Sequence, residues 1–411
     1  MTRSTGAVAR FAGLTVTLAL TMSACTSTAT PDVGATSAPA TSASTVTTPA
    51  TSPSNSATAS PSTSQKIVFG DPWSKDPARV HAVSRSAIRI IDSARRGQTL
   101  TFAMFNLTYP GLAESLVKAS RRGAAVRVVV NGEGDGGRQT RALRAELGTS
   151  LKARSFFRVR AGGMRMHSKF LLLSSRDASG PVVWTASGNV TMAGGRDQAN
   201  EAMTTTGDQA LYDFLAAQFA LMSKGVTDPR RLARTAETST AFVESFPLPK
   251  GGAKNDPVLR LLDDISCVHG DGHTVLRLAH YLFSHERLYL ADKLRDLVKA
   301  GCDVRMAGFL AGWDRVNVQA LIKPGPGKVG LRDVVGTDLH TKITSIEGWD
   351  AAGNPLQVVM VGTHNLTGRA LSRIPEGVND EIALTIRDPK VVDTYSTWVD
   401  WVISKHSRPA R

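Results

Sequence analysis

Two histidine-lysine pairs are the residues of this sequence whose types and spacing are best suited to chemistry. In the stretch MRMHSKFLLLSS, His167 and Lys169 are two residues apart at the start of an apolar run. In DLHTKITSIEG, His340 and Lys342 have the same spacing. Residues two apart in an extended strand project from one face, so each pair presents an imidazole and an ammonium group together.

Further polar residues follow each pair in the same order. Each pair is followed by a hydroxyl residue, one intervening residue and an asparagine, and then by a glutamate. The separations between equivalent positions in the two halves differ by only a few residues, which indicates an internal duplication. These residues are Ser187, Asn189 and Glu201 in the first half, and Thr363, Asn365 and Glu381 in the second half.

This set of side chains fits the cleavage of a phosphodiester. Negative charge grows on the non-bridging oxygens as phosphorus becomes five-coordinate, and two lysines and two asparagines supply donors for those oxygens. A neutral histidine can attack phosphorus, while a second, protonated histidine donates to the leaving alkoxide. No cluster of metal-ligand residues lies beside the pairs, so we expect no metal and no other cofactor.

Several members of the set also have an ordinary structural interpretation. Glu201 and Glu381 either hydrogen-bond the far ring nitrogens of the histidines and fix their tautomers, or form surface ion pairs. We expect Ser187 and Thr363 to brace their loops and not to react. His364, the variable residue of its motif, is expected to be a pocket wall.

The elements around the pairs predict the architecture. In the first half, residues 99–107 read as a strand, 111–123 as an amphipathic helix and 124–132 as a second strand. Residues 274–308 repeat this pattern in the second half. Such units are typical of parallel βαβ folds with reactive groups beyond the carboxyl ends of the strands. We therefore predict a duplicated α/β protein with mostly parallel sheets and halves at 66–245 and 246–411.

The paired motif resembles that of the phospholipase D superfamily, whose signature is His-x-Lys, four residues, Asp, and then Gly-Ser-x-Asn. The resemblance covers both halves. It departs at the aspartate, where the first copy has Ser174 and the second has Glu347, and at the glycine of the first copy, which is Ala186. The second copy keeps Gly362.

The resemblance implies two α/β halves related by a pseudo-two-fold axis, with His167 and His340 meeting between them. It implies that His167 is the nucleophile and His340 the general acid and later base. A nearby Glu347 would also favour a protonated His340. The residues expected to bind phosphate are Lys169, Asn189, Lys342 and Asn365, and the acids expected to orient the histidines are Glu201 and Glu381.

The N-terminus has the layout of a secretory signal. Two arginines and the apolar run at 11–20 precede small residues and Cys25, which resembles a bacterial lipobox. We predict a signal peptide at 1–25 with lipidation of Cys25, and plain secretion is the alternative. The run is shorter than the roughly 20 residues that span a bilayer. Residues 26–65 are nearly all Ser, Thr, Ala and Pro, which predicts a disordered linker.

The two remaining cysteines, Cys267 and Cys302, fall at the same predicted edge of one sheet. Cys267 follows a short helical pattern and Cys302 immediately precedes a strand. Because an exported chain can be oxidised, we predict a disulfide between them, and two free buried thiols are the alternative. Trp313, in a glycine-rich segment, is a candidate lid or lipid-contacting residue.

The net charge of +14 favours an anionic partner but does not choose among phospholipid, nucleic acid and other phosphates. The favoured hypothesis is an exported phospholipase D-like enzyme that hydrolyses or transfers a phospholipid headgroup at a membrane surface. The alternatives are a nuclease of the same superfamily and a non-catalytic anion-binding module. A chain with both half-sites is expected to work as a monomer.

Overall fold

The computed structural model describes residues 62–411. The predicted signal peptide, Cys25 and most of the predicted linker lie outside the described residues. The linker was expected to extend to residue 65, but strand β1 already begins at Ser64. No helix within 62–411 is long and apolar enough to cross a membrane.

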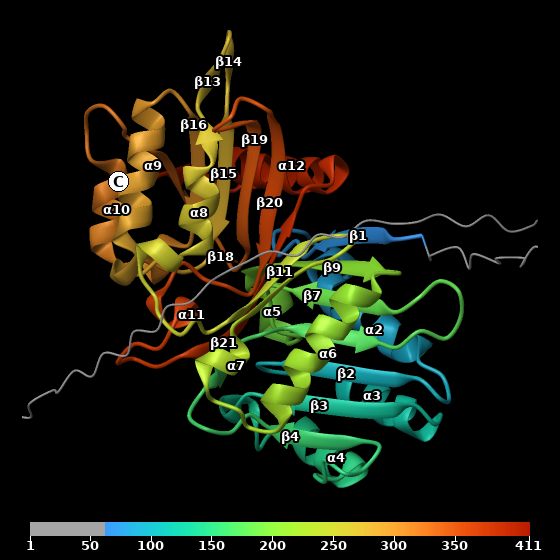
Figure 1. Ribbon diagram of the computed structural model, residues 1–411. Helices are drawn as coiled ribbons and strands as arrows, with labels where there is room; N and C mark the ends of the chain where they lie inside the picture. Colours follow the sequence, from blue (N-terminus) through green and yellow to red (C-terminus); the bar gives the residue numbers. More distant parts are fainter. Residues whose placement is uncertain (1–61) are drawn as a thin grey trace, which may run out of the picture. The chain divides into compact units, whose positions relative to one another are not determined.

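The first half builds a seven-stranded sheet in the order β1-β9-β7-β6-β2-β3-β4 (Figure 1). Strands β2, β3 and β4 are parallel to one another, and the remaining neighbours are antiparallel. The strands are β1 (Ser64–Phe69), β2 (Thr99–Met104), β3 (Ala125–Val130), β4 (Phe156–Val159), β6 (Phe170–Leu173), β7 (Val182–Ala186) and β9 (Glu201–Thr206).

The second half builds an eleven-stranded sheet along the path β10-β11-β21-β20-β19-β15-β16-β17-β22, with β12 and β5 joined at its sides. Strands β15, β16 and β17 are parallel. The strands are β5 (Arg165–Met166), β10 (Arg234–Glu237), β11 (Phe242–Phe246), β12 (Ile265–Ser266), β15 (Val275–His280), β16 (Asp303–Gly308), β17 (Gly330–Val334), β19 (Lys342–Asp350), β20 (Pro355–Gly362), β21 (Asn379–Ile386) and β22 (Ser407–Pro409).

The prediction of mostly parallel sheets is wrong. Apart from two short pairings between the halves, the parallel pairs lie in the strand-helix-strand units, where a helix supplies the crossover. The strand that follows each histidine-lysine pair instead connects to the next strand through a short loop. These loops span 174–181 and 351–354, and connections of that length join antiparallel neighbours.

Helices cover both faces of each sheet. In the first half, α2, α3 and α4 share a hydrophobic core with one face, and α6 packs on the other. In the second half, α8, α9 and α10 pack on one face and α12 on the other. The helices are α1 (Pro77–Val80), α2 (Ala82–Ser93), α3 (Leu112–Arg121), α4 (Arg138–Leu147), α5 (Met192–Arg196), α6 (Gln209–Ser223), α7 (Pro229–Leu232), α8 (Pro257–Asp263), α9 (Leu288–Lys299), α10 (Arg315–Ile322), α11 (Gly368–Leu371) and α12 (Pro389–Lys405).

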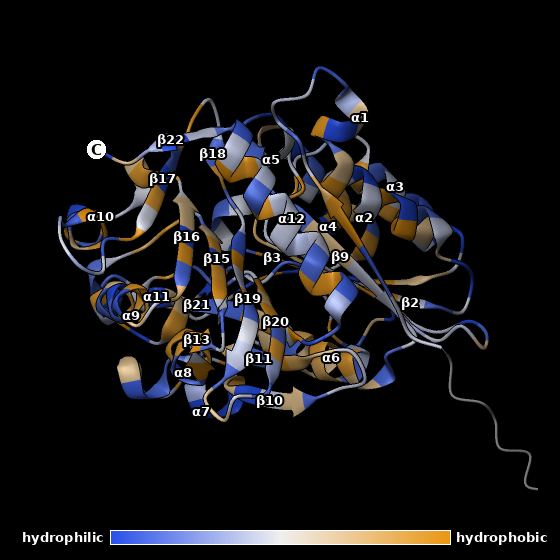
Figure 2. Cartoon of the chain, turned by 90° about the horizontal axis from the view of Figure 1, so that it is seen from above, coloured by the Kyte–Doolittle hydropathy of each residue, from blue (hydrophilic) through white to orange (hydrophobic). Residues whose placement is uncertain are grey.

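Local sequence signals start and orient these helices. Asp388 precedes α12, and its carboxylate accepts hydrogen bonds from the N–H groups of Lys390 and Val391, while Pro389 occupies the first turn, where no N–H is needed. Asp256 caps α8 in the same way. Helices α3 and α9 carry both hydrophobic and hydrophilic bands (Figure 2), which is the pattern expected of a helix with one face on a sheet.

The duplication predicted from the sequence is visible in reciprocal contacts between the halves. Strand β5, which precedes His167, pairs in parallel with the start of β21. The equivalent strand β18 (Asp338–Leu339), which precedes His340, pairs in parallel with β8 (Gln198–Ala199). Contacts that repeat with the two partners exchanged are the mark of a two-fold relation. The two halves are therefore related by a pseudo-two-fold axis, as expected.

Two further features are the boundary between the halves and the disulfide of the second half. β10 and β11 already belong to the second sheet, and β10 begins at Arg234, before the boundary that we placed after residue 245. The disulfide expected between Cys267 and Cys302 is present, with a Cα–Cα distance of 4.5 Å. It joins the segments before β15 and β16, at the edge of the sheet opposite the ends that carry the site described next.

Candidate active site

The histidine-lysine pairs lie at matching ends of the two sheets. His167 and Lys169 immediately precede β6, and Lys342 is the first residue of β19. In the second sheet, Lys342 pairs with His280, the last residue of the parallel strand β15. Both pairs thus lie beyond the carboxyl ends of the parallel strands, where the sequence placed them.

His167 is oriented by a carboxylate from the other half. Its Nδ1 lies 2.8 Å from Oε2 of Glu381, and Glu381 also accepts a hydrogen bond from the side chain of Asn379 at 2.8 Å. The Glu381 side chain is fully buried. With Nδ1–H donated to the carboxylate, Nε2 keeps its lone pair for a substrate, so the expectation that Glu381 orients a histidine is met.

His340 is oriented differently. Its Nδ1 lies 2.9 Å from Oδ1 of Asn200, a residue that the sequence analysis missed. Glu201, which was expected to orient a histidine, instead accepts a hydrogen bond from Ser187 Oγ at 2.7 Å. The two histidines therefore have unequal partners, a carboxylate for His167 and a neutral amide for His340.

The two lysines are almost completely buried and converge with the histidines. Lys169 Nζ donates to the carbonyl of His167 at 2.5 Å. Lys342 Nζ donates to the carbonyl of His340 and reaches the carbonyl of Ser187, in the first half, at 3.4 Å. Burial lowers the pKa of Lys169 to about 7, and burial together with the charge of Lys169 lowers the pKa of Lys342. A bound anion would restore both charges.

Burial also controls the acids and bases of the site. It lowers the pKa of His167 to about 4, although the charge of Glu381 acts in the opposite direction. Burial also lowers the pKa of His340. The positive charges of Lys342, Lys169 and His167 lower this pKa further. Burial raises the pKa of Glu201 to about 7. Groups with displaced pKa values gathered at one place are typical of catalytic sites.

The hydroxyl-x-asparagine motifs form the loops beside the pairs. Ser187 Oγ accepts from the backbone N–H of Glu201 at 3.1 Å, and Thr363 Oγ1 accepts from that of Ile382 at 3.0 Å, so both hydroxyls brace their loops as expected. Oδ1 of Asn189 and Oδ1 of Asn365 have no hydrogen-bond partner among the described residues. An amide oxygen only accepts hydrogen bonds, so the group of each asparagine that could hold a phosphate oxygen is its Nδ2.

The positions that carry aspartate in the superfamily signature lie away from this site. Ser174 Oγ accepts from the N–H of Thr99, at the start of β2. Glu347 pairs across the sheet with Val275, at the start of β15, and contacts Arg277 at 3.3 Å. The expectation that Glu347 would favour a protonated His340 is therefore wrong, because Glu347 lies beside the start of β15, whereas Lys342 lies beside its end.

Two aromatic residues that the sequence analysis missed flank the histidines. The ring of Phe105 lies 5.7 Å from that of His167, and the ring of Tyr281 lies 4.3 Å from that of His340. Their separation of 176 residues equals that of Asn189 and Asn365, and this equality was the signal available in the sequence. Phe309 stacks on Tyr281 at 5.8 Å.

Trp313 does not lie where a lid was expected, whereas His364 lines a cavity as expected of a pocket wall. Trp313 is only 6% exposed, and its Nε1 donates to the carbonyl of Tyr281 at 3.1 Å, so the interpretation as a lid or lipid-contacting residue is wrong. His364 is buried, stacks on Phe246 at 4.5 Å and lines an enclosed cavity.

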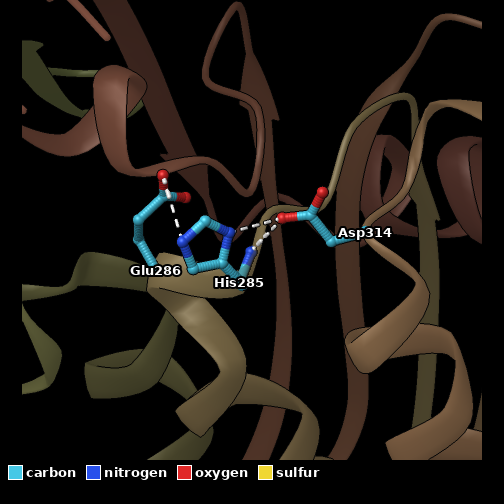
Figure 3. A group of neighbouring side chains, drawn as sticks. All are labelled: His285, Glu286 and Asp314. Carbon is cyan, nitrogen blue, oxygen red and sulfur yellow. Dashed lines mark hydrogen bonds and ion pairs between the residues drawn. The ribbon is translucent and has the colours of Figure 1, made fainter. Parts of the chain in front are cut away.

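His285, Glu286 and Asp314 form a group of metal-ligand residue types within 62–411 (Figure 3). Asp314 lies 2.8 Å from Nδ1 of His285, and Glu286 lies 4.0 Å from Nε2. Because the carboxylates face opposite ring nitrogens, this arrangement is that of an exposed ion-pair cluster. None of the three belongs to the paired motifs.

A groove of about 760 Å³ lies beside α8 and β11. Its walls carry both acidic and basic side chains, including Glu237, Glu244 and Arg260. None of the residues of the paired motifs lines it. We therefore place the candidate active site at the histidine-lysine pairs and not in this groove.

Comparison with known proteins agrees with this fold. Residues 87–222 match the family model described as cardiolipin synthase, PLD-like domain. No curated protein sequence matches the chain significantly. This match lies in the first half of the chain and supports the resemblance to the phospholipase D superfamily. Solved structures, described next, support the fold of both halves.

Two solved structures share the fold over most of the chain. A phosphatidylserine synthase of Haemophilus influenzae is 13% identical, with a TM-score of 0.52 over 84% of this chain and 87% of that one. A polyphosphate kinase of Porphyromonas gingivalis is 13% identical, with a TM-score of 0.55 over 82% of this chain. This chain spans only 50% of that kinase. The described residues have the duplicated phospholipase D-like fold.

Proposed function

We propose that this protein is a phosphodiesterase of the phospholipase D type that cleaves the headgroup phosphodiester of phospholipids through a covalent phosphohistidine. The observation that carries the proposal is the contact of His167 with Glu381, at 2.8 Å across the two halves. It brings together motifs that are far apart in the sequence and supplies a histidine with a fixed tautomer beside two buried lysines.

His167 is the proposed nucleophile. Its Nε2 attacks phosphorus while Glu381 holds Nδ1–H, so the carboxylate stabilises the positive charge that the ring gains when the N–P bond forms. Lys169, Lys342, Asn189 and Asn365 hold the non-bridging oxygens.

His340 is the proposed general acid. Its proton goes to the leaving alkoxide as the P–O bond breaks, and its low pKa makes the imidazolium a strong acid once a bound phosphate favours its protonation. The same ring then accepts a proton from water, which attacks phosphorus and releases His167. An alcohol in place of water would give transfer of the headgroup. No metal is needed in these steps, so EDTA should leave the activity unchanged.

A phospholipid substrate is favoured over nucleic acid by two considerations. The matched family model carries the name cardiolipin synthase, and a structure with the same fold over both chains carries the name phosphatidylserine synthase. The N-terminal pattern in the sequence also favours export to a membrane surface with Cys25 as a lipid anchor. Cys25→Ala should move the full-length protein from the membrane fraction to the soluble fraction if the anchor is correct.

The test is an assay of the purified protein on phosphatidylcholine vesicles and on plasmid DNA, with His167→Ala as the control. Headgroup release that the variant lacks supports the proposal. Cleavage of DNA but not of lipid would favour the nuclease alternative. Binding of both anions without turnover would favour the non-catalytic module.

A further inference from the structure

His280 and His364 are two buried histidines that the proposed reaction does not use. They are 3% and 4% exposed. Nε2 of His280 lies 2.9 Å from Thr344 Oγ1, and the ring of His364 stacks on Phe246. Nδ1 of His280 and Nε2 of His364, however, have no hydrogen-bond partner among residues 62–411. A buried polar atom in this state is costly unless water satisfies it.

Both imidazoles line the same enclosed cavity, which lies against Lys342. The space open to the centre of a water molecule is about 10 Å³, close to the minimum that one water requires. The remaining walls are mostly apolar apart from Lys342 and Thr344, and each imidazole has one nitrogen without a partner among residues 62–411. The other lining residues are Val258, Thr344, Met360, Val361, Gly362 and Ala383.

The two rings are suited to share one water because both are neutral. Burial and the positive charges of Arg287 and Lys342 lower the pKa of His280 to about 3. Burial and the charge of Arg287 lower the pKa of His364 as well. A neutral imidazole has one donor and one acceptor nitrogen, and a water molecule can donate to one ring and accept from the other.

The first half has no equivalent of this pair. At the separation of 176 residues that relates Asn189 to Asn365, the counterparts of His280 and His364 are Met104 and Gly188. A Cβ atom at Gly188 would lie 2.3 Å from the side chain of Asn200, the partner of His340. The fold therefore forms the same loop without two histidines, and their presence in the second half needs another explanation.

We propose that His280 and His364 bind a single water molecule behind Lys342, and that this hydrated pair positions Lys342 and Asn365 for phosphate binding. Lys342 forms one wall of the cavity, so a filled cavity prevents its side chain from withdrawing from the site. His364 is adjacent in sequence to Asn365, so anchoring the ring also anchors that loop. This proposal depends on the proposed function in one respect, namely that Lys342 and Asn365 bind the phosphate of the substrate.

The test combines a crystal structure with a matched pair of variants. A high-resolution structure of the wild-type protein should show a water molecule within hydrogen-bond distance of His280 Nδ1 and His364 Nε2. His364→Gln keeps a polar group near the position of Nε2, whereas His364→Leu removes it at similar volume. By calorimetry at pH 7, we expect His364→Leu to bind inorganic phosphate about tenfold more weakly, and His364→Gln within about threefold of wild type.

A cavity without water density, or equal phosphate binding by all three proteins, would overturn the proposal. If His364→Leu does not fold, the wild-type crystal structure alone decides. Neither measurement uses a lipid or turnover, so an error in the substrate assigned above would leave both results unchanged.

Discussion

The unequal partners of the two histidines define the site at the level of single residues. His167 donates to a buried carboxylate at 2.8 Å, and His340 to an amide oxygen at 2.9 Å. A carboxylate stabilises positive charge on its histidine more strongly than an amide does. This asymmetry favours His167 as the residue that carries the phosphoryl group, and it replaces the argument from Glu347 that the sequence suggested.

Replacing the carboxylate tests this asymmetry. Glu381→Gln should lower kcat by roughly 10² or more, because the variant no longer stabilises the charged ring or enforces its tautomer. Glu347→Gln is the matched control and should stay within about twofold of wild type, since Glu347 contacts Arg277 away from the site, beside the start of β15. Equal losses in the two variants, measured by steady-state kinetics, would refute the assignment.

The displaced pKa values predict how anion binding depends on pH. Above pH 7, Lys169, whose pKa burial lowers to about 7, loses its positive charge. Over the same range Glu201, whose pKa burial raises to about 7, gains a negative charge. Both changes weaken the binding of an anion.

The inhibition constant of diethyl phosphate, whose charge is constant over this range, should therefore increase several-fold from pH 6 to pH 8. Lys169→Arg, which stays charged, should show a smaller increase. Tighter inhibition at pH 8 than at pH 6 would contradict the electrostatic account.

The nearly constant separation between equivalent residues of the two halves made most site residues predictable, because a duplicated fold places equivalent residues at equivalent points. Glu381 was found in this way and contacts His167 as expected. Asn200 was not found, because Glu201 beside it is the more obvious partner for a histidine. Only the backbone path shows that Glu201 faces Ser187 while Asn200 faces His340.

At the level of elements, the strand-helix-strand units were predictable from hydrophobic periodicity, but the sheet order was not. The expectation of mostly parallel sheets arose because the sequence pattern shows the units but not the short loops that reverse the chain after β6 and β19. Loop length decides this point, since a loop of four residues at 351–354 cannot carry a parallel crossover.

The disulfide between Cys267 and Cys302 stabilises the edge of the second sheet that lies away from the site. It closes a loop of 35 residues, and such a cross-link typically contributes about 3 kcal/mol. The double variant Cys267→Ser/Cys302→Ser should lose roughly this much stability in urea unfolding and keep its activity at 25 °C. Loss of activity in the still-folded variant would show that this edge is coupled to the site.

At the level of the whole molecule, a buried ion pair holds the two halves in register. Arg160 in the first half contacts Asp380 in the second at 2.6 Å, with both side chains fully buried. The backbone carbonyl of Asp380 also accepts from the N–H of His167 at 3.0 Å. The pair thus fixes the strand that carries Glu381 next to the proposed nucleophile.

Breaking this pair should be costly. Arg160→Met leaves the Asp380 carboxylate buried without its partner, which typically costs 3–5 kcal/mol. Arg408→Met, which breaks a largely exposed pair with Asp333, should cost less than about 1 kcal/mol. The free energies of unfolding in urea compare the two, and similar values would mean that the buried pair does not hold the halves together.

We expect the two halves to form one site in which His167 carries the phosphoryl group. Rapid acid quenching of the protein with a labelled p-nitrophenyl phosphodiester, followed by peptide mapping, tests it most directly. We expect label on His167 in the wild-type protein, label retained in His340→Ala because p-nitrophenolate leaves without protonation, and none in His167→Ala. Label on His340 in the wild-type protein would show that His340, and not His167, is the nucleophile.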